Sequence, residues 1–169
     1  HNCLVGSEMC IRDRLCSDYQ RVHGVEVRIM RIFNTYGPNM RFDDGRVISN
    51  FIIQALKDQD ITLYGDGSQT RSFCYVDDLI NGMILLMDSS YRNPINIGNP
   101  NEYTISELAN MVRNLINPNL KLRYKELPQD DPKQRKPSIE LAKNILNWEP
   151  KIELKDGLLK TISWFKENL

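Results

Sequence analysis

The sequence has no excess of charge of either sign and no long hydrophobic run. Its 169 residues carry 22 basic and 22 acidic side chains, so the formal net charge is zero. That balance removes the long-range field that nucleic-acid binders and membrane-surface binders use. No apolar run approaches the roughly 20 residues of a membrane helix, and no basic-then-apolar signal opens the chain. We expect no nucleic-acid partner, no membrane, and a cytoplasmic protein that binds a small molecule.

Metal-binding patterns of cysteine and histidine are also missing. The sequence holds four cysteines and two histidines, and none of them falls at the short paired spacing of zinc sites. We interpret the cysteines as free thiols in a reducing compartment and expect no metal site. These residues are Cys3, Cys10, Cys16, Cys74, His1 and His23.

A third absence concerns dinucleotide binding. A complete dinucleotide-binding domain has a glycine-rich turn between a strand and a helix, followed about 20 residues later by an acidic residue. No such unit occurs in this sequence. We therefore expect no pyrophosphate cradle on this chain.

Hydrophobic patterning predicts strands that alternate with helices, which places the chain in the α/β class. The glycine turn 65–68 and the extended stretch 71–76 predict a hairpin-like excursion. Strands are predicted at 25–33, 61–64, 95–98 and 120–124, with a turn at 34–38 and a polar loop at 127–137. Helices are predicted at 46–57, 77–87, 138–146 and 154–168, together with one that Thr104 or Ser106 caps and that ends near Ile116.

Three polar clusters interrupt the apolar segments: Asn34-Thr35-Tyr36, Gln69-Thr70-Arg71, and Arg135. Ligands of α/β sheets bind at strand ends. The commoner role of an asparagine at such a place is to hydrogen-bond its own turn. The commoner role of Arg71 is a surface ion pair, here with Asp66. Two arginines nevertheless offer the parallel donors that suit a diphosphate or a carboxylate, so both interpretations stay open.

Two tyrosines and an acidic pair have similar alternatives. Tyr36 and Tyr64 could stack on a base or a ribose, although aromatic residues at strand ends are more often part of the core. Asp77 and Asp78 most simply belong to the first turn of a helix, where carboxylates interact favourably with the helix dipole.

The order of several strings along the chain is more informative than any one of them. The strings are 31–38 (RIFNTYGP), 44–51 (DGRVISNF), 64–71 (YGDGSQTR), 134–139 (QRKPSI) and 147–150 (NWEP). Together they resemble the UDP-glucuronate decarboxylases, which are extended short-chain dehydrogenases of the NAD-dependent epimerase/dehydratase superfamily. The resemblance covers residues 15–169. The last two strings are the more specific to these decarboxylases, since much of the superfamily shares the others.

The resemblance implies a fold and a set of binding residues. Residues 15–169 would be the carboxyl-terminal part of a Rossmann-like fold with the small substrate-binding subdomain, mainly binding the nucleotide sugar. Asn34 would hold the sugar or its phosphate. Asn50 and the adjacent helix would both contact the diphosphate. Tyr64 would lie near the uridine, and Arg71 would neutralise diphosphate charge. Arg135 would face the glucuronate carboxylate or the pyrophosphate and would act electrostatically during catalysis.

The same resemblance implies NAD as the cofactor and a homodimer for the full-length protein. The implied reaction oxidises UDP-glucuronate at C4, releases carbon dioxide and returns the hydride to give UDP-xylose. One alternative is another nucleotide-sugar epimerase or a 4,6-dehydratase, and the Arg135 string favours the decarboxylase. Another alternative is a non-catalytic nucleotide-sugar binding module.

The chain departs from the family pattern at its amino terminus. The catalytic Tyr and Lys of the family would fall at Val5 and Met9, neither of which exchanges a proton. The whole stretch 3–14 fails to resemble the family and resembles translated sequencing-adapter sequence. We therefore expect residues 1–14 to be foreign to the gene. We also expect the chain by itself to be inactive.

Overall fold

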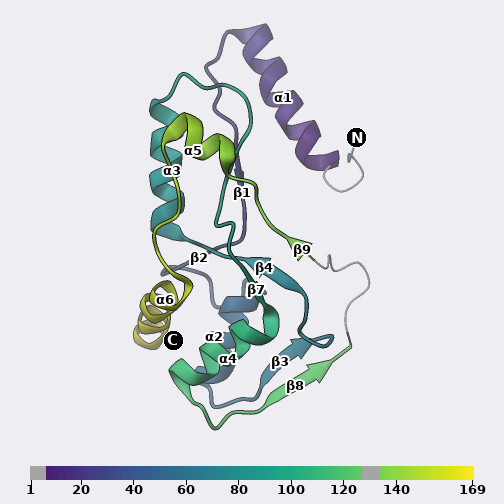
Figure 1. The fold of residues 1–169 in the computed structure, drawn as a ribbon, viewed down its shortest axis with the longest axis vertical. Helices are drawn as coiled ribbons and strands as arrows, with labels where there is room; N and C mark the ends of the chain where they lie inside the picture. The colour runs from purple at the N-terminus through teal and green to yellow at the C-terminus, as the bar shows by residue number, and fades with distance from the viewer. Residues whose placement is uncertain (1–6, 127–133) are drawn as a thin grey trace.

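The structure is a computed structural model that describes residues 7–126 and 134–169; for residues 7–10 and 134–135 it describes the backbone only. Helices and mostly parallel strand pairs alternate along the chain, so the α/β prediction is confirmed. Figure 1 shows two lobes joined by two sets of short strands. We name them the pocket lobe and the open lobe below.

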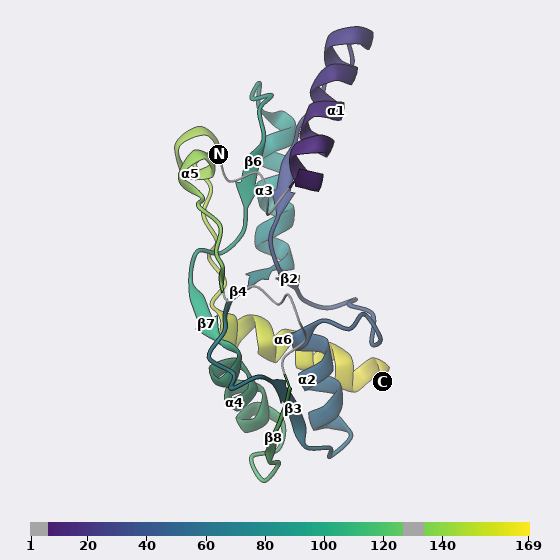
Figure 2. The same ribbon diagram turned by 90° about the vertical axis from the view of Figure 1, so that its right-hand side faces the viewer.

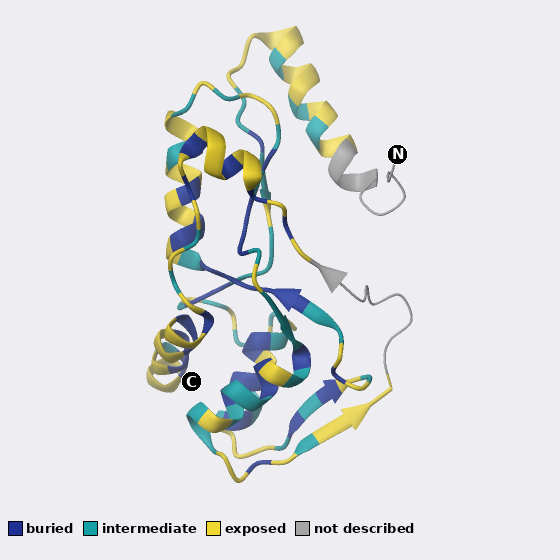
Figure 3. Ribbon diagram, in the orientation of Figure 1, coloured by how far each residue is buried: buried dark blue, intermediate teal, exposed yellow. Residues whose placement is uncertain are grey.

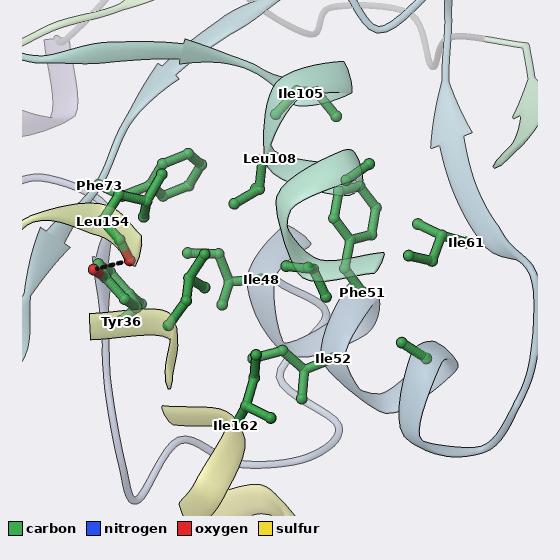
Figure 4. Packing of buried hydrophobic residues seen from close by; sticks show 14 of the residues in the cluster. Tyr36, Ile48, Phe51, Ile52, Ile61, Phe73, Ile105, Leu108, Leu154 and Ile162 are labelled. Carbon is green, nitrogen blue, oxygen red and sulfur yellow. Dashed lines mark hydrogen bonds between the residues drawn. The ribbon is translucent and has the colours of Figure 1, made fainter. Parts of the chain in front are cut away.

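The pocket lobe contains α2 (Val47–Leu56), β3 (Ile61–Tyr64), α4 (Ile105–Ile116), β8 (Leu122–Lys125) and α6 (Leu154–Asn168). Strands β3 and β8 pair in parallel, and the three helices pack together beside them. Ile52, Leu108 and Phe165 are fully buried in its core. Figure 4 shows how side chains from α2, α4 and α6 interdigitate with Phe73 and Tyr36.

The open lobe contains β1 (Met30–Ile32), α3 (Val76–Asp88), β6 (Ile95–Ile97) and α5 (Glu140–Leu146). Strands β1 and β6 pair in parallel. Its buried core is smaller, and it includes Cys74, Ile97 and Trp148. Close packing at Gly82 of α3 explains the small residue there, because a Cβ would lie 2.9 Å from Ile97 and 3.0 Å from Trp148.

Two short strand sets connect the lobes. Strand β2 (Thr35–Tyr36) pairs in parallel with β5 (Cys74–Tyr75). Strand β4 (Thr70–Ser72) lies between β7 (Glu102–Thr104), which is antiparallel to it, and β9 (Gln134–Arg135), which is parallel. In Figure 2 the chain passes through this region on its way from one lobe to the other.

Helix α1 (Ser7–His23) stands to one side of the open lobe in Figure 1. Asp13 ties it to the open lobe, because its carboxylate accepts a hydrogen bond from Arg31 Nε at 3.0 Å. Most of its described side chains are exposed, as Figure 3 shows. Of the segment predicted to be foreign, residues 1–6 lie outside the described residues and residues 7–14 belong to this helix.

Asp78 was expected only at a helix start, and the structure gives its carboxylate a second role. It is in the first turn of α3 but is buried, and its Oδ2 accepts hydrogen bonds from the backbone N–H groups of Lys151 (3.0 Å) and Ile152 (2.9 Å). Its backbone oxygen accepts from Trp148 Nε1 at 3.0 Å. Asp78 therefore holds the segment between α5 and α6, which connects the two lobes.

The helix predictions are confirmed within about two residues at each end, and α4 begins with Thr104 as its cap. One cap is wrong. Helix α5 follows Ile139 and not Ser138, because the Ser138 carbonyl accepts a hydrogen bond from Asn96 Nδ2 instead.

The strand predictions were less accurate. The strand predicted at 25–33 shrinks to Met30–Ile32, because β1 has β6 as its one hydrogen-bonded neighbour among the described strands. The hairpin is wrong, since β3 pairs with β8 and β4 pairs with β7 and β9. The turn at 34–38 contains β2, because Thr35 and Tyr36 find partners in β5. The polar loop at 127–137 contains β9, and residues 127–133 lie outside the described part.

Candidate functional site

A cavity of about 470 Å³ lies on the pocket lobe. It opens where the ends of β2, β3 and β4 meet the first turns of α2. This volume is within the usual range of small-molecule sites, about 300–1,000 Å³. The apolar part of its wall comes from side chains such as Ile48, Phe51 and Phe73, which also belong to the core. The core therefore fixes the shape of the cavity.

Four of the five predicted binding residues line this cavity: Asn34, Asn50, Tyr64 and Arg71. They come from separate elements of the fold, and as many as 37 positions of sequence separate them. The fifth, Arg135, has a side chain outside the described part of the chain. Its backbone in β9 is in register with Arg71 in β4, so the two residues are neighbours across a parallel strand pair.

Asn34 is held by distant backbone and not by its own turn. Its Nδ2 donates a hydrogen bond to the Ser72 carbonyl at 3.2 Å, and its own carbonyl accepts from Cys74 N at 2.9 Å. The alternative that Asn34 bonds its local turn is therefore wrong. These two bonds join the end of β1 to the β4–β5 connection at the cavity wall.

Arg71 is in the central strand of its sheet and is only 9% exposed. Its Nη1 donates to the Thr70 carbonyl at 2.8 Å. Arg71 is therefore not the surface residue that the ion-pair alternative required. A guanidinium this buried is costly without polar partners. Asp66, its suggested partner, accepts hydrogen bonds from the Ser68 backbone and hydroxyl.

The beginning of α2 contributes a second cation. Arg46 precedes the helix, its Nη1 donates to the Thr35 carbonyl at 3.3 Å, and its Nε lies 3.7 Å from Asp44 Oδ2. Asn50, one turn later, donates from Nδ2 to the Gly45 carbonyl at 3.2 Å. The positive end of the helix dipole faces the cavity here, which favours an anion.

The loop that leads into α2 is anchored from outside the cavity. Phe42 stacks on Trp164 of α6 with ring centroids 5.6 Å apart and meets Phe165 edge to face at 5.2 Å. This loop carries Met40 and Arg46, both of which line the cavity. The aromatic cluster therefore positions one wall of the site.

The charge of the cavity is one-sided. Among the described residues that line it, Arg46, Arg71 and Lys125 are basic and none is acidic. Arg46 and Lys125 were missed as site residues. Arg46 lies in the segment 44–51 that carries part of the family resemblance, so its positive charge beside a predicted helix start could have identified it. Lys125 reaches the site only because β8 pairs with β3, which no local pattern reveals.

Tyr36 does not stack on a ligand. It is 2% exposed, and its hydroxyl donates to the Leu154 carbonyl at 3.2 Å, as the dashed line in Figure 4 marks. Burial raises the pKa of this phenol far above its ordinary value. The core interpretation is therefore confirmed for Tyr36. Tyr64 differs, since it is 47% exposed at the end of β3.

The chain offers no tyrosine and lysine pair for acid–base chemistry. None of its seven tyrosines has a lysine four residues later. Of the two positions where the pair was expected, Val5 lies outside the described residues and Met9 is in α1.

Cys16 and Cys74 are free thiols, and the side chains of Cys3 and Cys10 lie outside the described part. Within residues 7–126 and 134–169, no three metal-ligating side chains gather into a cluster. No helix over these ranges has the length and apolar character needed to cross a bilayer.

The cavity with its basic lining lies at strand ends of an α/β arrangement, which is where the ligands of such sheets bind. The sequence profile of the NAD dependent epimerase/dehydratase family matches residues 10–98, which is more than half of the chain. The chain belongs to this family.

The chain is similar to curated and solved members of the family. It is 55% identical over 148 residues to UDP-glucuronic acid decarboxylase 3 of Arabidopsis thaliana, an alignment that covers 88% of this chain and 43% of the relative. The chain thus spans less than half the length of that relative.

Two solved structures have the same fold. UDP-glucose 4-epimerase of Thermotoga maritima, solved with UDP-glucose, has a TM-score of 0.89 at 25% identity, covering 94% of this chain and 52% of that one. UDP-glucuronic acid 4-epimerase of Bacillus cereus, solved with UDP-glucuronic acid and NAD, has a TM-score of 0.83 at 29% identity. This match covers 91% of this chain and 49% of that one.

Proposed function

We propose that this chain is the nucleotide-sugar-binding part of an NAD-dependent UDP-glucuronate decarboxylase, which converts UDP-glucuronate to UDP-xylose and carbon dioxide. The observation that carries the proposal is the convergence of Asn34, Asn50, Tyr64 and Arg71 on one cavity whose described charged residues are all basic. A UDP-sugar carries its charge in the diphosphate, and such a cavity suits it. The 55% identity to the Arabidopsis decarboxylase supports the choice of reaction.

Each proposed role follows from the position of the residue. Arg71, buried in its strand, and Arg46, at the start of α2, neutralise the diphosphate. Asn34 is held at the strand end by Ser72 and there binds the sugar or its phosphate. Asn50 assists at the diphosphate from the first turns of α2, and exposed Tyr64 contacts the uridine.

The proposed role of Arg135 rests on its register with Arg71. Two adjacent arginines would give the substrate two positive charges along one wall. One of them serves the diphosphate, and Arg135 faces the glucuronate carboxylate or the neighbouring pyrophosphate. A cation at that place acts electrostatically as the carboxylate leaves.

The residues that the structure describes contain no glycine-rich turn of the kind that cradles the pyrophosphate of NAD. The glycines at 65 and 67 stand between two strands, β3 and β4, and not between a strand and a helix, so they form no pyrophosphate cradle. We propose that the cofactor, which supplies hydride transfer, binds to other parts of the longer enzyme. The buried phenol of Tyr36 cannot substitute for the family's catalytic tyrosine. We therefore propose that the chain binds its ligand without turning it over.

Two alternatives remain distinct proposals. A nucleotide-sugar epimerase is supported by the likeness to the Bacillus cereus UDP-glucuronic acid 4-epimerase, at 29% identity; a 4,6-dehydratase belongs to the same class. A non-catalytic binding module is supported by the missing tyrosine and lysine pair. Upstream codons that restore a glycine-rich turn and that pair would exclude the module.

The domain boundary is also a proposal. We propose that residues 15–169 are native and that residues 1–14 are foreign, although the family match begins at residue 10. Amplification of the source locus tests this, and a native reading frame that encodes residues 1–14 would contradict it. For the full-length enzyme we propose a homodimer in the cytoplasm that binds neither nucleic acid nor a membrane.

Titration of the purified chain with UDP and UDP-glucuronate tests the binding function. We expect Arg71→Ala to weaken UDP binding about 10- to 100-fold, because it removes charge-assisted hydrogen bonds. Arg41→Ala is the matched control, since Arg41 is exposed, pairs with Asp43 and lies outside the cavity lining. Equal affinity in both variants would contradict the proposal, as would carbon dioxide release from UDP-glucuronate by the chain alone.

A further inference from the structure

Lys125 lies at the end of β8, beside the cavity. Strand β8 pairs in parallel with β3, and Lys125 is in register with Tyr64. The Lys125 carbonyl accepts a hydrogen bond from Gly65 N at 2.8 Å, so its backbone is held just where β3 ends. The position of the lysine is therefore set by the same strand pair that presents Tyr64.

Lys125 lines two cavities at once. The second cavity, of about 480 Å³, shares Gln54, Thr62 and Lys125 with the first. The first two of these residues are tied together, because Thr62 N donates to Gln54 Oε1 at 3.0 Å. Among these three shared residues, Lys125 is the charged one.

The acidic residues near this wall have other partners. Asp60 and Asp58 line the second cavity. Asp60 Oδ2 accepts from Arg123 Nε at 2.7 Å, and that hydrogen bond lowers the pKa of the carboxyl. Asp58 Oδ1 accepts from Asn117 Nδ2 at 2.9 Å. Within the described part of the chain Lys125 forms no ion pair, and its side chain is exposed.

We infer that Lys125 is a further nucleotide-binding residue, whose ammonium contacts the phosphate next to the nucleoside. The inference rests on the proposed function and deepens it. A lysine ammonium is a compact charge with three donors, which suits one phosphate oxygen. Because Lys125 is beside Tyr64, it acts at the nucleotide end of the ligand. Arg71 and Arg135 are in the other strand set.

Calorimetric titration of the 169-residue chain with UDP, UMP and uridine tests the inference. We expect Lys125→Met to lower the affinity for UDP and for UMP about 3- to 10-fold, which is the effect of losing one solvent-accessible charged contact. Uridine has no phosphate, so its affinity stays unchanged. Lys125→Arg keeps most of the affinity. The difference between wild type and Lys125→Met shrinks when salt rises from about 0.05 M to about 0.5 M, because exposed charges are screened.

Lys121→Met is the matched control, since Lys121 precedes β8, is exposed and lines neither cavity. Wild-type affinity of Lys125→Met for UDP overturns the inference, and so does an equal loss for uridine, which would assign the contact to the base. If Arg71→Ala lowers the affinity for UDP while Lys125→Met does not, the inference fails and the proposed function stands. A wild-type chain that binds no UDP overturns both.

Discussion

The pocket lobe and the open lobe differ in how their helices use their apolar faces. In the pocket lobe, α2 and α4 bury Ile52, Leu108 and Val112 completely. In the open lobe, α3 buries Leu79 and Leu86 but leaves another apolar stripe in solvent, as the alternating colours along this helix in Figure 3 show. That stripe is Ile80, Met83, Ile84 and Met87.

The spacing of the α3 stripe is that of a packed helix face, i, i+3, i+4 and i+7. Helix α1 has a second exposed apolar stripe with the spacing i, i+4, i+8 and i+11, which is Ile11, Leu15, Tyr19 and Val22. Both stripes leave several large apolar side chains of one helix in solvent. The comparison teaches that the cavity lies on the lobe whose helices bury more of their apolar side chains.

The largest expected difference between the lobes comes from one substitution made in each. Ile52→Ala in α2 should lower the free energy of unfolding by about 2–5 kcal/mol, because it leaves a cavity in a closed core. Ile84→Ala in α3 should change it by less than about 0.5 kcal/mol, because Ile84 is 52% exposed. Urea denaturation measures both. Equal losses would mean that the two lobes are packed alike.

A smaller effect is expected where the lobes are connected. Asp78→Ala removes the acceptor of two backbone N–H groups, so we expect a loss of about 2–4 kcal/mol. Hydrogen exchange at Lys151 and Ile152 should accelerate in the same variant. The control is Asp77→Ala, which changes the exposed neighbour in the same turn and should cost under about 1 kcal/mol. Unchanged exchange at these two amides would contradict the role given to Asp78.

The smallest effect concerns the cap of α4 in the pocket lobe and depends on pH. Glu107 accepts hydrogen bonds from the backbone and side chain of Thr104, and these lower its pKa. A lowered folded-state pKa contributes stability above the unfolded value of about 4.3, and this is lost as pH falls through the folded value.

Thr104→Ala should cost about 1 kcal/mol at pH 7. Glu107→Gln should flatten the acid side of the stability profile between about pH 5 and pH 3. Thermal melts across this range measure both effects. A Glu107→Gln profile that parallels the wild type would show that the capping box contributes nothing to the pH dependence.

The sequence predicted the local parts of this fold well. The apolar periodicity placed α2, α3, α4 and α6 within about two residues, since helical hydrogen bonds and capping are local. It misplaced the strand partners, because β3 and β8 are separated by 57 residues of chain and their register is decided by packing. The hairpin prediction failed for this reason.

The same division holds for the site. Asn34, Asn50, Tyr64 and Arg71 were named from strings of sequence, and the structure brings all four to one cavity. Arg46 was passed over although it stood in such a string. Lys125 could not be found, since its place in the cavity depends on the pairing of β8 with β3.

The residue types along the chain determined the helices, the absence of a dinucleotide fingerprint and the polar residues at strand ends, because each depends on neighbours in sequence. Only the tertiary structure decided which of those residues meet, which lobe is closed, and that Asp78 and Lys125 have further roles. These outcomes depend on contacts between distant segments, whose geometry a local pattern does not contain.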